Sequence, residues 1–306
     1  MTTTRYGLCC MHTGLESQGH KFQTMTRKRF MDLGRASALP VLCERYVNNL
    51  VTMRETLIEC AKHNWCYRAS SDIFPLMTLD TAELCYEQLP NVRVLDNLFS
   101  QCKEIIATNN LRVSCHPDQF NVLASDNAVA VDRTIVELNH HGWFMSKLGL
   151  PLNYDAPINI HINASRGDIA DITKRFIANF DRLSNDVRSR LVVENEDKGI
   201  WNVGNLYYVF HAATKIPITF DYLHHACNND GMTEQQAFTL CASTWHGHKP
   251  LFHYCEAMPR QNNPRKHADY PAQTPNVYDT AVDLDYEFKD KDAAIVRATK
   301  LATVAI

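Results

Sequence analysis

The chain has 306 residues, 45% of them hydrophobic, and a formal net charge of −3 at pH 7. This composition is typical of a globular protein with a large core. The charge excludes a surface that is basic throughout, so any contact with nucleic acid has to come from a local basic patch.

The 11 cysteines are scattered, and no two of them form a C-x-x-C pair. This pattern predicts free thiols in a reducing compartment and argues against a disulfide framework or a zinc knuckle. No apolar run is long enough to span a bilayer, and residues 1–7 contain no apolar signal region. We therefore expect an intracellular protein of the cytoplasm, nucleoid or nucleus. We expect no signal peptide, no membrane partner and no obligate protein partner.

Short β-rich segments alternate with helical segments along the whole chain. The expected strands cover residues 6–10, 65–69, 111–115, 158–162, 191–194, 218–222, 251–255 and 282–288. Residues 46–60 and 131–148 between them have apolar residues at helical spacing, as in Leu50, Met53 and Leu57. Asp168 is placed to cap a further helix that carries Phe176 and Phe180.

This alternation predicts an α/β protein with a single (β/α)8 TIM barrel that spans residues 1–306 as one domain. A doubly wound sheet is the alternative, but no G-x-G-x-x-G follows the first expected strand. The chain contains no low-complexity linker and no break in composition that would divide it into two domains.

Residue types that bind metals recur at or just past the ends of the expected strands. They are Asp72, His116, His161, Glu194, Asp221, His224, His253, His267 and Glu287, in chain order from the second strand to the eighth. In a barrel these C-terminal strand ends converge on one mouth, where active sites of this fold lie. One histidine at a strand end is more often a hydrogen-bonded structural residue than a ligand. Recurrence at successive strands favours a metal site at the mouth.

The charges of these residues point the same way. Glu194, Asp221 and Glu287 would repel one another in a partly dry pocket, and bound divalent cations are the simplest way to reconcile them. Mixed histidine and carboxylate ligands suit Zn²⁺ or Mn²⁺ and argue against a thiolate site. Two or three cations at one mouth are well suited to hold a phosphodiester during its hydrolysis.

Four segments carry a resemblance to a known family. They are Ser-Cys-His-Pro-Asp-Gln-Phe (114–120), Val-Glu-Asn-Glu-Asp (193–197) followed by Trp201 and Asn202, Phe-Asp-Tyr-Leu-His-His-Ala (220–226) and Tyr-Glu-Phe-Lys-Asp-Lys-Asp (286–292). In order and spacing they resemble the motifs of the ultraviolet-damage endonucleases. The combination is specific, although each short motif alone is weak.

The resemblance implies a metal-dependent DNA repair enzyme that nicks damaged double-stranded DNA immediately 5′ to UV photoproducts. It extends this expectation to other lesions such as abasic sites. It also implies two or three manganese ions, with zinc or magnesium as alternatives, and Glu194, Asp221 and Glu287 as catalytic carboxylates. The implied ligands are His116, His161 and Glu194 for one ion; Glu194, Asp221, His253 and Glu287 for a second; His224 and His267 for a third; and Asp72 as a further candidate.

The resemblance also implies a lesion probe, because Gln119 and Phe120 match a Gln-Tyr pair that wedges into the duplex opposite the damaged bases. An aromatic ring can replace the stacking that disappears when poorly paired bases are extruded. The alternative is that Phe120 fills the core beneath the following loop.

Three positions depart from the family pattern. Leu251 stands where members commonly have a lysine two residues before the histidine of the seventh strand. Leu8 replaces a tyrosine near the start of the first strand, and Phe120 replaces the tyrosine of the probe. The metal ligands are thus retained, while the residues that would touch the lesion differ, so the reaction type is better supported than the lesion type.

Basic residues cluster near the expected mouth. Positive charges there would bind phosphates despite the acidic total; the alternative is an ordinary solvated loop. The expected DNA-binding residues are Arg260, Arg265, Lys266, Lys289 and Lys291, and a second cluster, Lys21, Arg27, Lys28 and Arg29, lies on the long loop expected after the first strand.

Two other functions are compatible with this pattern. A sugar isomerase or epimerase on a similar metal-binding barrel would share the mouth residues but would need neither a basic rim nor an aromatic wedge. A damage-binding protein with a weakened site is the non-enzymatic alternative. The full ligand set argues against it, and Leu251 is the feature in its favour.

Overall fold

The structure is a computed structural model that describes residues 4–304, and it contains one sheet of eight parallel strands. The order of the strands is β6-β5-β4-β3-β2-β1-β8-β7. Their bounds are β1 Tyr6–Cys9, β2 Cys66–Ala69, β3 Val113–Cys115, β4 Ile158–Ile160, β5 Leu191–Glu194, β6 Ile218–Thr219, β7 Leu251–Tyr254 and β8 Asp283–Tyr286. All eight expected strands are present, although most are shorter than expected.

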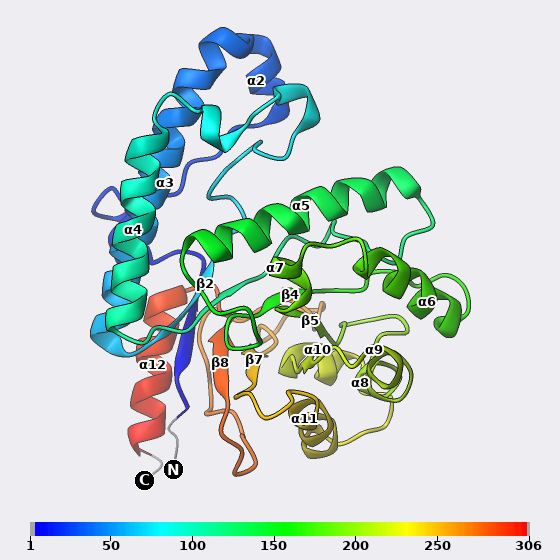
Figure 1. The fold of residues 1–306 in the computed structure, drawn as a ribbon. Helices are drawn as coiled ribbons and strands as arrows, with labels where there is room; N and C mark the ends of the chain where they lie inside the picture. Colours follow the sequence, from blue (N-terminus) through cyan, green and yellow to red (C-terminus); the bar gives the residue numbers. More distant parts are fainter. Residues whose placement is uncertain (1–3, 305–306) are drawn as a thin grey trace.

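The sheet closes on itself between its two end strands. Asp221, just beyond β6, forms a parallel bridge with His253 in β7, and the His253 amide donates to the Phe220 carbonyl at 2.9 Å. The chain is therefore a single TIM barrel, as the alternation of segments predicted (Figure 1).

Helices surround the strands on the outside of the barrel (Figure 1). The expected helix at 46–60 lies within α3, and the one at 131–148 lies within α5 except for Leu148, which is its C-cap. The Asp168 carboxylate caps α6 by accepting from the Ala170 amide at 2.9 Å. The helices are α1 Thr13–Glu16, α2 Arg27–Leu33, α3 Arg35–His63, α4 Val92–Thr108, α5 Ala128–Lys147, α6 Ile169–Phe180, α7 Asn185–Arg188, α8 Val203–Asn205, η3 Leu206–His211, α9 Ala212–Thr214, α10 Tyr222–Cys227, α11 Glu234–Ser243 and α12 Lys291–Val304, with short turns η1 Asp80–Ala82 and η2 Tyr86–Gln88.

One sequence expectation is corrected here. The basic cluster at 21–29 was expected on a loop, but Arg27, Lys28 and Arg29 form the first turn of α2, which lies at the top of the view beyond the barrel (Figure 1). The Thr26 hydroxyl begins this helix by accepting from the Arg29 amide at 3.2 Å. Capping by threonine, rather than apolar periodicity, specifies this short helix.

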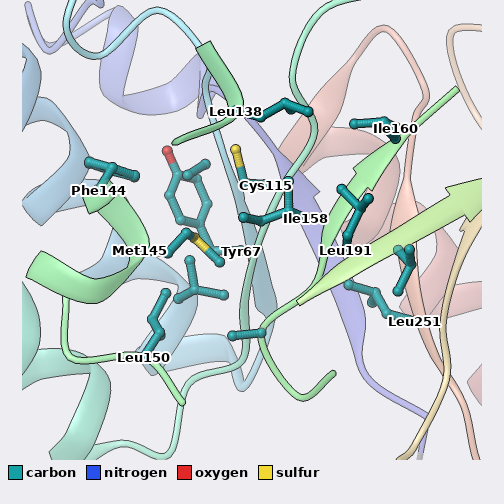
Figure 2. Packing of buried hydrophobic residues seen from close by; sticks show 14 of the residues in the cluster. Tyr67, Cys115, Leu138, Phe144, Met145, Leu150, Ile158, Ile160, Leu191 and Leu251 are labelled. Carbon is teal, nitrogen blue, oxygen red and sulfur yellow. The ribbon is translucent and has the colours of Figure 1, made fainter. Parts of the chain in front are cut away.

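Alternation along the strands separates the apolar core from a polar barrel interior. Tyr67 of β2 is fully buried against Cys115 of β3 and Met145 of α5, in the layer between strands and helices (Figure 2). In β8, Leu284 and Tyr286 belong to that core, whereas Asp283 and Asp285 alternate with them and point inward. The inner face of the barrel therefore carries charged side chains, and the outer face of the strands carries the apolar core.

All 11 cysteines are free, as the sequence predicted. Within residues 4–304, no helix is both long and apolar enough to cross a membrane. Residues 1–3, part of the segment in which we expected no signal region, lie outside the described residues.

Candidate metal centre

The proposed ligands gather at the C-terminal mouth because every strand of the barrel is parallel. Glu194 is the last residue of β5, and His253 lies inside β7. His116, His161 and Glu287 each follow directly on the last residue of β3, β4 and β8. Since parallel strands end at the same rim, these side chains meet although they are up to 171 positions apart in the sequence, from His116 to Glu287.

Glu194 is the centre of this cluster, and only 1% of its surface is exposed. Its Oε2 atom lies 3.1 Å from His116 Nε2, 3.1 Å from His253 Nδ1 and 3.8 Å from His161 Nε2. Its other oxygen, Oε1, lies 3.0 Å from His224 Nδ1. One carboxylate thus contacts four imidazoles, which is the arrangement expected of a bridging metal ligand.

Hydrogen bonds to α10 and to Asn195 fix the position of Asp221. Its Oδ1 atom accepts from the His224 amide at 2.6 Å, which makes Asp221 the N-cap of that helix. The Asn195 side chain pairs with the Asp221 backbone, accepting at 2.8 Å and donating at 3.0 Å. The second oxygen, Oδ2, is buried and has no hydrogen-bond partner among the described residues. Asp221 therefore presents one free acceptor at a fixed position.

Glu287 completes a second group with Asp221 and His253. Its Oε1 atom lies 3.3 Å from His253 Nδ1 and also accepts from the Arg68 guanidinium of β2. His253 Nδ1 is buried between the carboxylates of Glu194 and Glu287, while Asp221 Oδ2 is buried without a hydrogen-bond partner within residues 4–304. Burying such atoms without partners costs free energy, which a cation would offset.

The donor set fits divalent cations. The ligand atoms fall into three groups, in each of which all atoms lie within 4.8 Å of one another. All three contain imidazole nitrogen and carboxylate oxygen and no thiolate, a mixture that suits Mn²⁺ or Zn²⁺. The groups are His116, Glu194 and His253; His161, Glu194 and His224; and Asp221, His253 and Glu287.

Burial and neighbouring charges perturb the pKa values at the mouth in both directions. Burial raises the pKa of Asp221 to about 6, and the Glu194 charge adds to this shift. Burial lowers the pKa of His161 to about 4, so this imidazole is neutral and its nitrogen can bind a metal at neutral pH. Burial would raise the pKa of Glu194, but His253 and His161 hold it well below the usual range. Glu194 is therefore anionic.

His267 and Asp72 lie outside the three groups. His267 Nδ1 is 2.8 Å from the Glu287 carbonyl and 3.8 Å from its Oε2 atom, so this ring is at the edge of the cluster. Asp72 lines a pocket of about 560 Å³ together with Phe120. The segment after β2 thus directs Asp72 to the wall of this pocket and not into the cluster.

The probe residues project from the loop after His116. Phe120 is 77% exposed, so the alternative that it fills the core is wrong. The Phe120 amide donates to Asp118 Oδ1 at 2.8 Å, and the Gln119 carbonyl accepts from Asn163 at 2.8 Å. These bonds hold the loop that presents the ring.

The five predicted DNA-binding residues lie on two segments that are neighbours in space. Residues 256–268 fold back on themselves through a bridge between Ala257 and His267, and the Lys289 amide donates to the Ala268 carbonyl at 3.1 Å. Arg265 contacts Asp197 at 3.3 Å but remains largely exposed. The two segments meet beside His267 and Glu287; Arg260, Arg265, Lys266 and Lys289 on them are exposed, and Lys291 is half-buried.

The structure also places residues that the sequence pattern did not single out. Asn159 donates to Glu194 Oε2, and Arg68 and Asp285 lie inside the barrel beneath the ligands. Each of Asn159 and Asp285 stands two residues before a proposed ligand, so period-two alternation along the strand is the signal that identifies them. The two departures in the strands are buried: Leu8 in the core, and Leu251 on the inner face two residues before His253.

Comparisons with known proteins identify the family and agree with the fold. The UV DNA damage endonuclease of Nostoc sp. is 28% identical over 284 residues, covering 90% of this chain and 84% of that protein. The crystal structure of SacUVDE covers 99% of both chains at a TM-score of 0.83 and 26% identity. Endonuclease IV from Thermus thermophilus shares the fold, with a TM-score of 0.57 and 12% identity over 98% of this chain and 99% of the other. A family model described as UV-endonuclease UvdE matches residues 4–305, and the chain therefore belongs to the UV-endonuclease UvdE family.

Proposed function

We propose that residues 1–306 fold as one domain with the activity of a metal-dependent DNA endonuclease, which nicks damaged duplexes on the 5′ side of UV photoproducts. The observation that carries the proposal is Glu194, a buried carboxylate within 3.8 Å of four imidazoles at the mouth of the barrel. Family membership supports the substrate, since the similar proteins are named for endonuclease action at UV damage. With such a substrate, we expect the activity inside the cell.

The ligands fit two cations that share Glu194, with manganese as the expected metal and zinc or magnesium as the alternatives. As the family resemblance implies, His116, His161 and Glu194 would hold one, and Asp221, His253 and Glu287 would hold the other with Glu194 between them. The close groups of the structure differ in that they join His116 to His253 and His161 to His224. His224 and His267 remain candidates for a third ion, and Asp72 is a weaker candidate. Bound divalent cations supply Lewis acidity and an activated water for phosphodiester hydrolysis.

The remaining parts of the mouth would bind the duplex. Arg260, Arg265, Lys266, Lys289 and Lys291 form the rim that contacts phosphates, which adds affinity without reading sequence. Gln119 and Phe120 would enter the duplex opposite the lesion. The exposed ring of Phe120 favours this role, because an aromatic side chain held in water by an ordered loop gives up nothing from the core when it stacks on a base.

The same barrel also supports sugar epimerases, and the ligand set alone does not distinguish the two reactions. Family membership and the exposed probe loop favour DNA. The three ligand groups argue against a binding protein without activity, because it would have no use for unpartnered atoms such as Asp221 Oδ2.

The test is incision of duplexes that carry one pyrimidine dimer, one abasic site or no damage, each with Mn²⁺, Mg²⁺, Zn²⁺ or EDTA. We expect a nick 5′ to the dimer with Mn²⁺, weaker cutting at the abasic site and none with EDTA. Mapping the ends on a sequencing gel tests the side of the cut. Full incision in EDTA would contradict metal dependence.

A further inference from the structure

The inner face of β8 carries three acidic residues in succession, and only two of them have an assigned role. Asp283, at the bottom of the barrel, forms ion pairs with Arg5, Arg112 and Lys249. Glu287, at the mouth, belongs to the metal cluster. Asp285 lies between them and is fully buried.

Two neighbours of Asp285, Ser114 and Gly7, accommodate its buried carboxylate. Its Oδ2 atom accepts from the Ser114 hydroxyl of β3 at 3.2 Å, while its Oδ1 atom has no hydrogen-bond partner in the described part of the chain. A Cβ atom at Gly7, the neighbour of Asp285 in β1, would lie 2.0 Å from Oδ1. Only glycine at position 7 leaves room for this carboxylate.

Asp285 is also the neighbour of His253 in the sheet, since the two residues are paired in the register of β7 and β8. The His253 ring turns Nδ1 toward Glu194 and Glu287, at 3.1 and 3.3 Å, and Nε2 toward Asp285 Oδ2, at 3.9 Å. β7 itself offers Nε2 no polar side chain from below, because the preceding residue on the inner face is Leu251.

A metal-ligating imidazole usually donates its second N–H to a carboxylate or carbonyl, which fixes the tautomer and the direction of the ring. We propose that Asp285 is the positioning residue for His253: its carboxylate attracts Nε2–H across the 3.9 Å that separates them and keeps the unprotonated Nδ1 directed between Glu194 and Glu287. This inference rests on the proposed metal binding at the mouth.

The test is Mn²⁺ affinity of the full-length protein by isothermal titration, with Asp285→Asn as the variant. The amide keeps the volume but offers His253 a poorer acceptor, so we expect binding about 10- to 100-fold weaker than in the wild type. Asp283→Asn is the matched control, because it makes the same change on the same strand face two residues further from the mouth. We expect Asp283→Asn to lower the thermal stability, because it weakens the ion pairs of Asp283, but to leave the Mn²⁺ affinity unchanged.

A spectroscopic measurement separates positioning from a merely structural role. In protein loaded with diamagnetic Zn²⁺ and labelled with ¹⁵N-histidine, the wild type gives a protected Nε2–H signal for His253, and Asp285→Asn loses it or shifts it. If Asp285→Asn does not fold, Ser114→Ala frees the carboxylate more gently and should weaken Mn²⁺ binding in the same direction by a smaller factor.

The outcomes distinguish the two proposals. If the wild type binds no Mn²⁺ or Zn²⁺, the proposed metal site fails and the role of Asp285 fails with it. If the wild type binds Mn²⁺ and Asp285→Asn binds it equally well, or only melts earlier, the positioning role alone is wrong.

Discussion

Asp221 and His253 form the bridge that closes the barrel, and both belong to the same group of proposed metal ligands. β6 contains only two residues, so the seam between β6 and β7 depends on this bridge and on the bond from the His253 amide to the Phe220 carbonyl. Closing the fold and assembling the site are therefore the same structural event.

A cation at this seam should hold the barrel closed. We expect saturating Mn²⁺ to raise the melting temperature by about 5 °C, as expected for a ligand at 100 times its dissociation constant. Amide exchange in the peptide that contains His253 should slow more than in the peptide that contains Tyr67, between β1 and β3. A thermal melt checks the first expectation and hydrogen exchange by mass spectrometry the second, each with EDTA as the reference. Equal protection of the two peptides would place the cation away from the seam.

Glu194→Gln removes the charge that the four imidazoles share while preserving the volume of the side chain. We expect the folded variant to lose incision activity and also the Mn²⁺-induced rise in melting temperature. Glu196→Gln is the matched control: it lies two residues further along, outside the three ligand groups, and bonds to the Asn163 amide. It should retain the rise. Near-normal incision by purified Glu194→Gln would show that this carboxylate does not bridge metals.

Charge reversal on the rim tests the DNA contact. Arg265→Glu with Lys266→Glu should weaken binding to damaged and undamaged duplex alike, because phosphate contacts carry no lesion information. The slope of log K against log salt should become shallower by about 2, roughly one unit for each phosphate that the protein no longer neutralises. Lys62→Glu with Lys103→Glu, on α3 and α4 near the opposite end of the barrel, is the control. The same slope in both double variants would place the DNA elsewhere.

Asp283 predicts how the barrel responds to acid. Burial would raise the pKa of Asp283, but Arg5, Lys249 and Arg112 lower it from 3.8 to about 2. Because the pKa is depressed in the folded state, the stabilisation is complete above about pH 4 and is lost as the pH falls toward 2. It amounts to about 2 kcal/mol. Asp283→Asn should lower the free energy of urea unfolding by that order at pH 7, by roughly half as much at pH 3 and by little at pH 2.

The sequence predicts the strands well because each buried parallel strand is a short apolar run. It predicts the end of β6 poorly, since Asp221 leaves the strand to cap α10 and capping depends on backbone geometry that periodicity does not contain. The position of Asp72 was likewise not predictable, because the segment after β2 places it in the wall of a pocket beside Phe120 and periodicity does not contain the path of that segment. The inward direction of Asp285 could be predicted from its alternation with Glu287. Its proposed role depends on its neighbour His253 in β7, which only the register of the two strands identifies.

The probe loop allows the sharpest test of how damage is recognised. Phe120 has the stacking face of a tyrosine without the hydroxyl, so recognition should depend on how easily the bases unstack and not on a hydrogen bond from the ring. Stacking of a base on an aromatic ring contributes about 1–3 kcal/mol. Phe120→Ala should therefore weaken binding to damaged duplex by about 10- to 100-fold. Binding to undamaged duplex should change little, because intact pairs are not opened.

Two features of the structure make this experiment clean. Since Phe120 is 77% exposed, its truncation should leave the melting temperature unchanged, so a weaker affinity reports on DNA and not on folding. Tyr208, 64% exposed on η3, is the matched aromatic control, and Tyr208→Ala should alter neither affinity. Phe120→Tyr should bind almost as the wild type does. The measurement is the ratio of damaged to undamaged affinity at one salt concentration across these variants. If Phe120→Ala lowers both affinities by the same factor, the ring contacts the DNA backbone or an unopened groove, and the wedge is wrong.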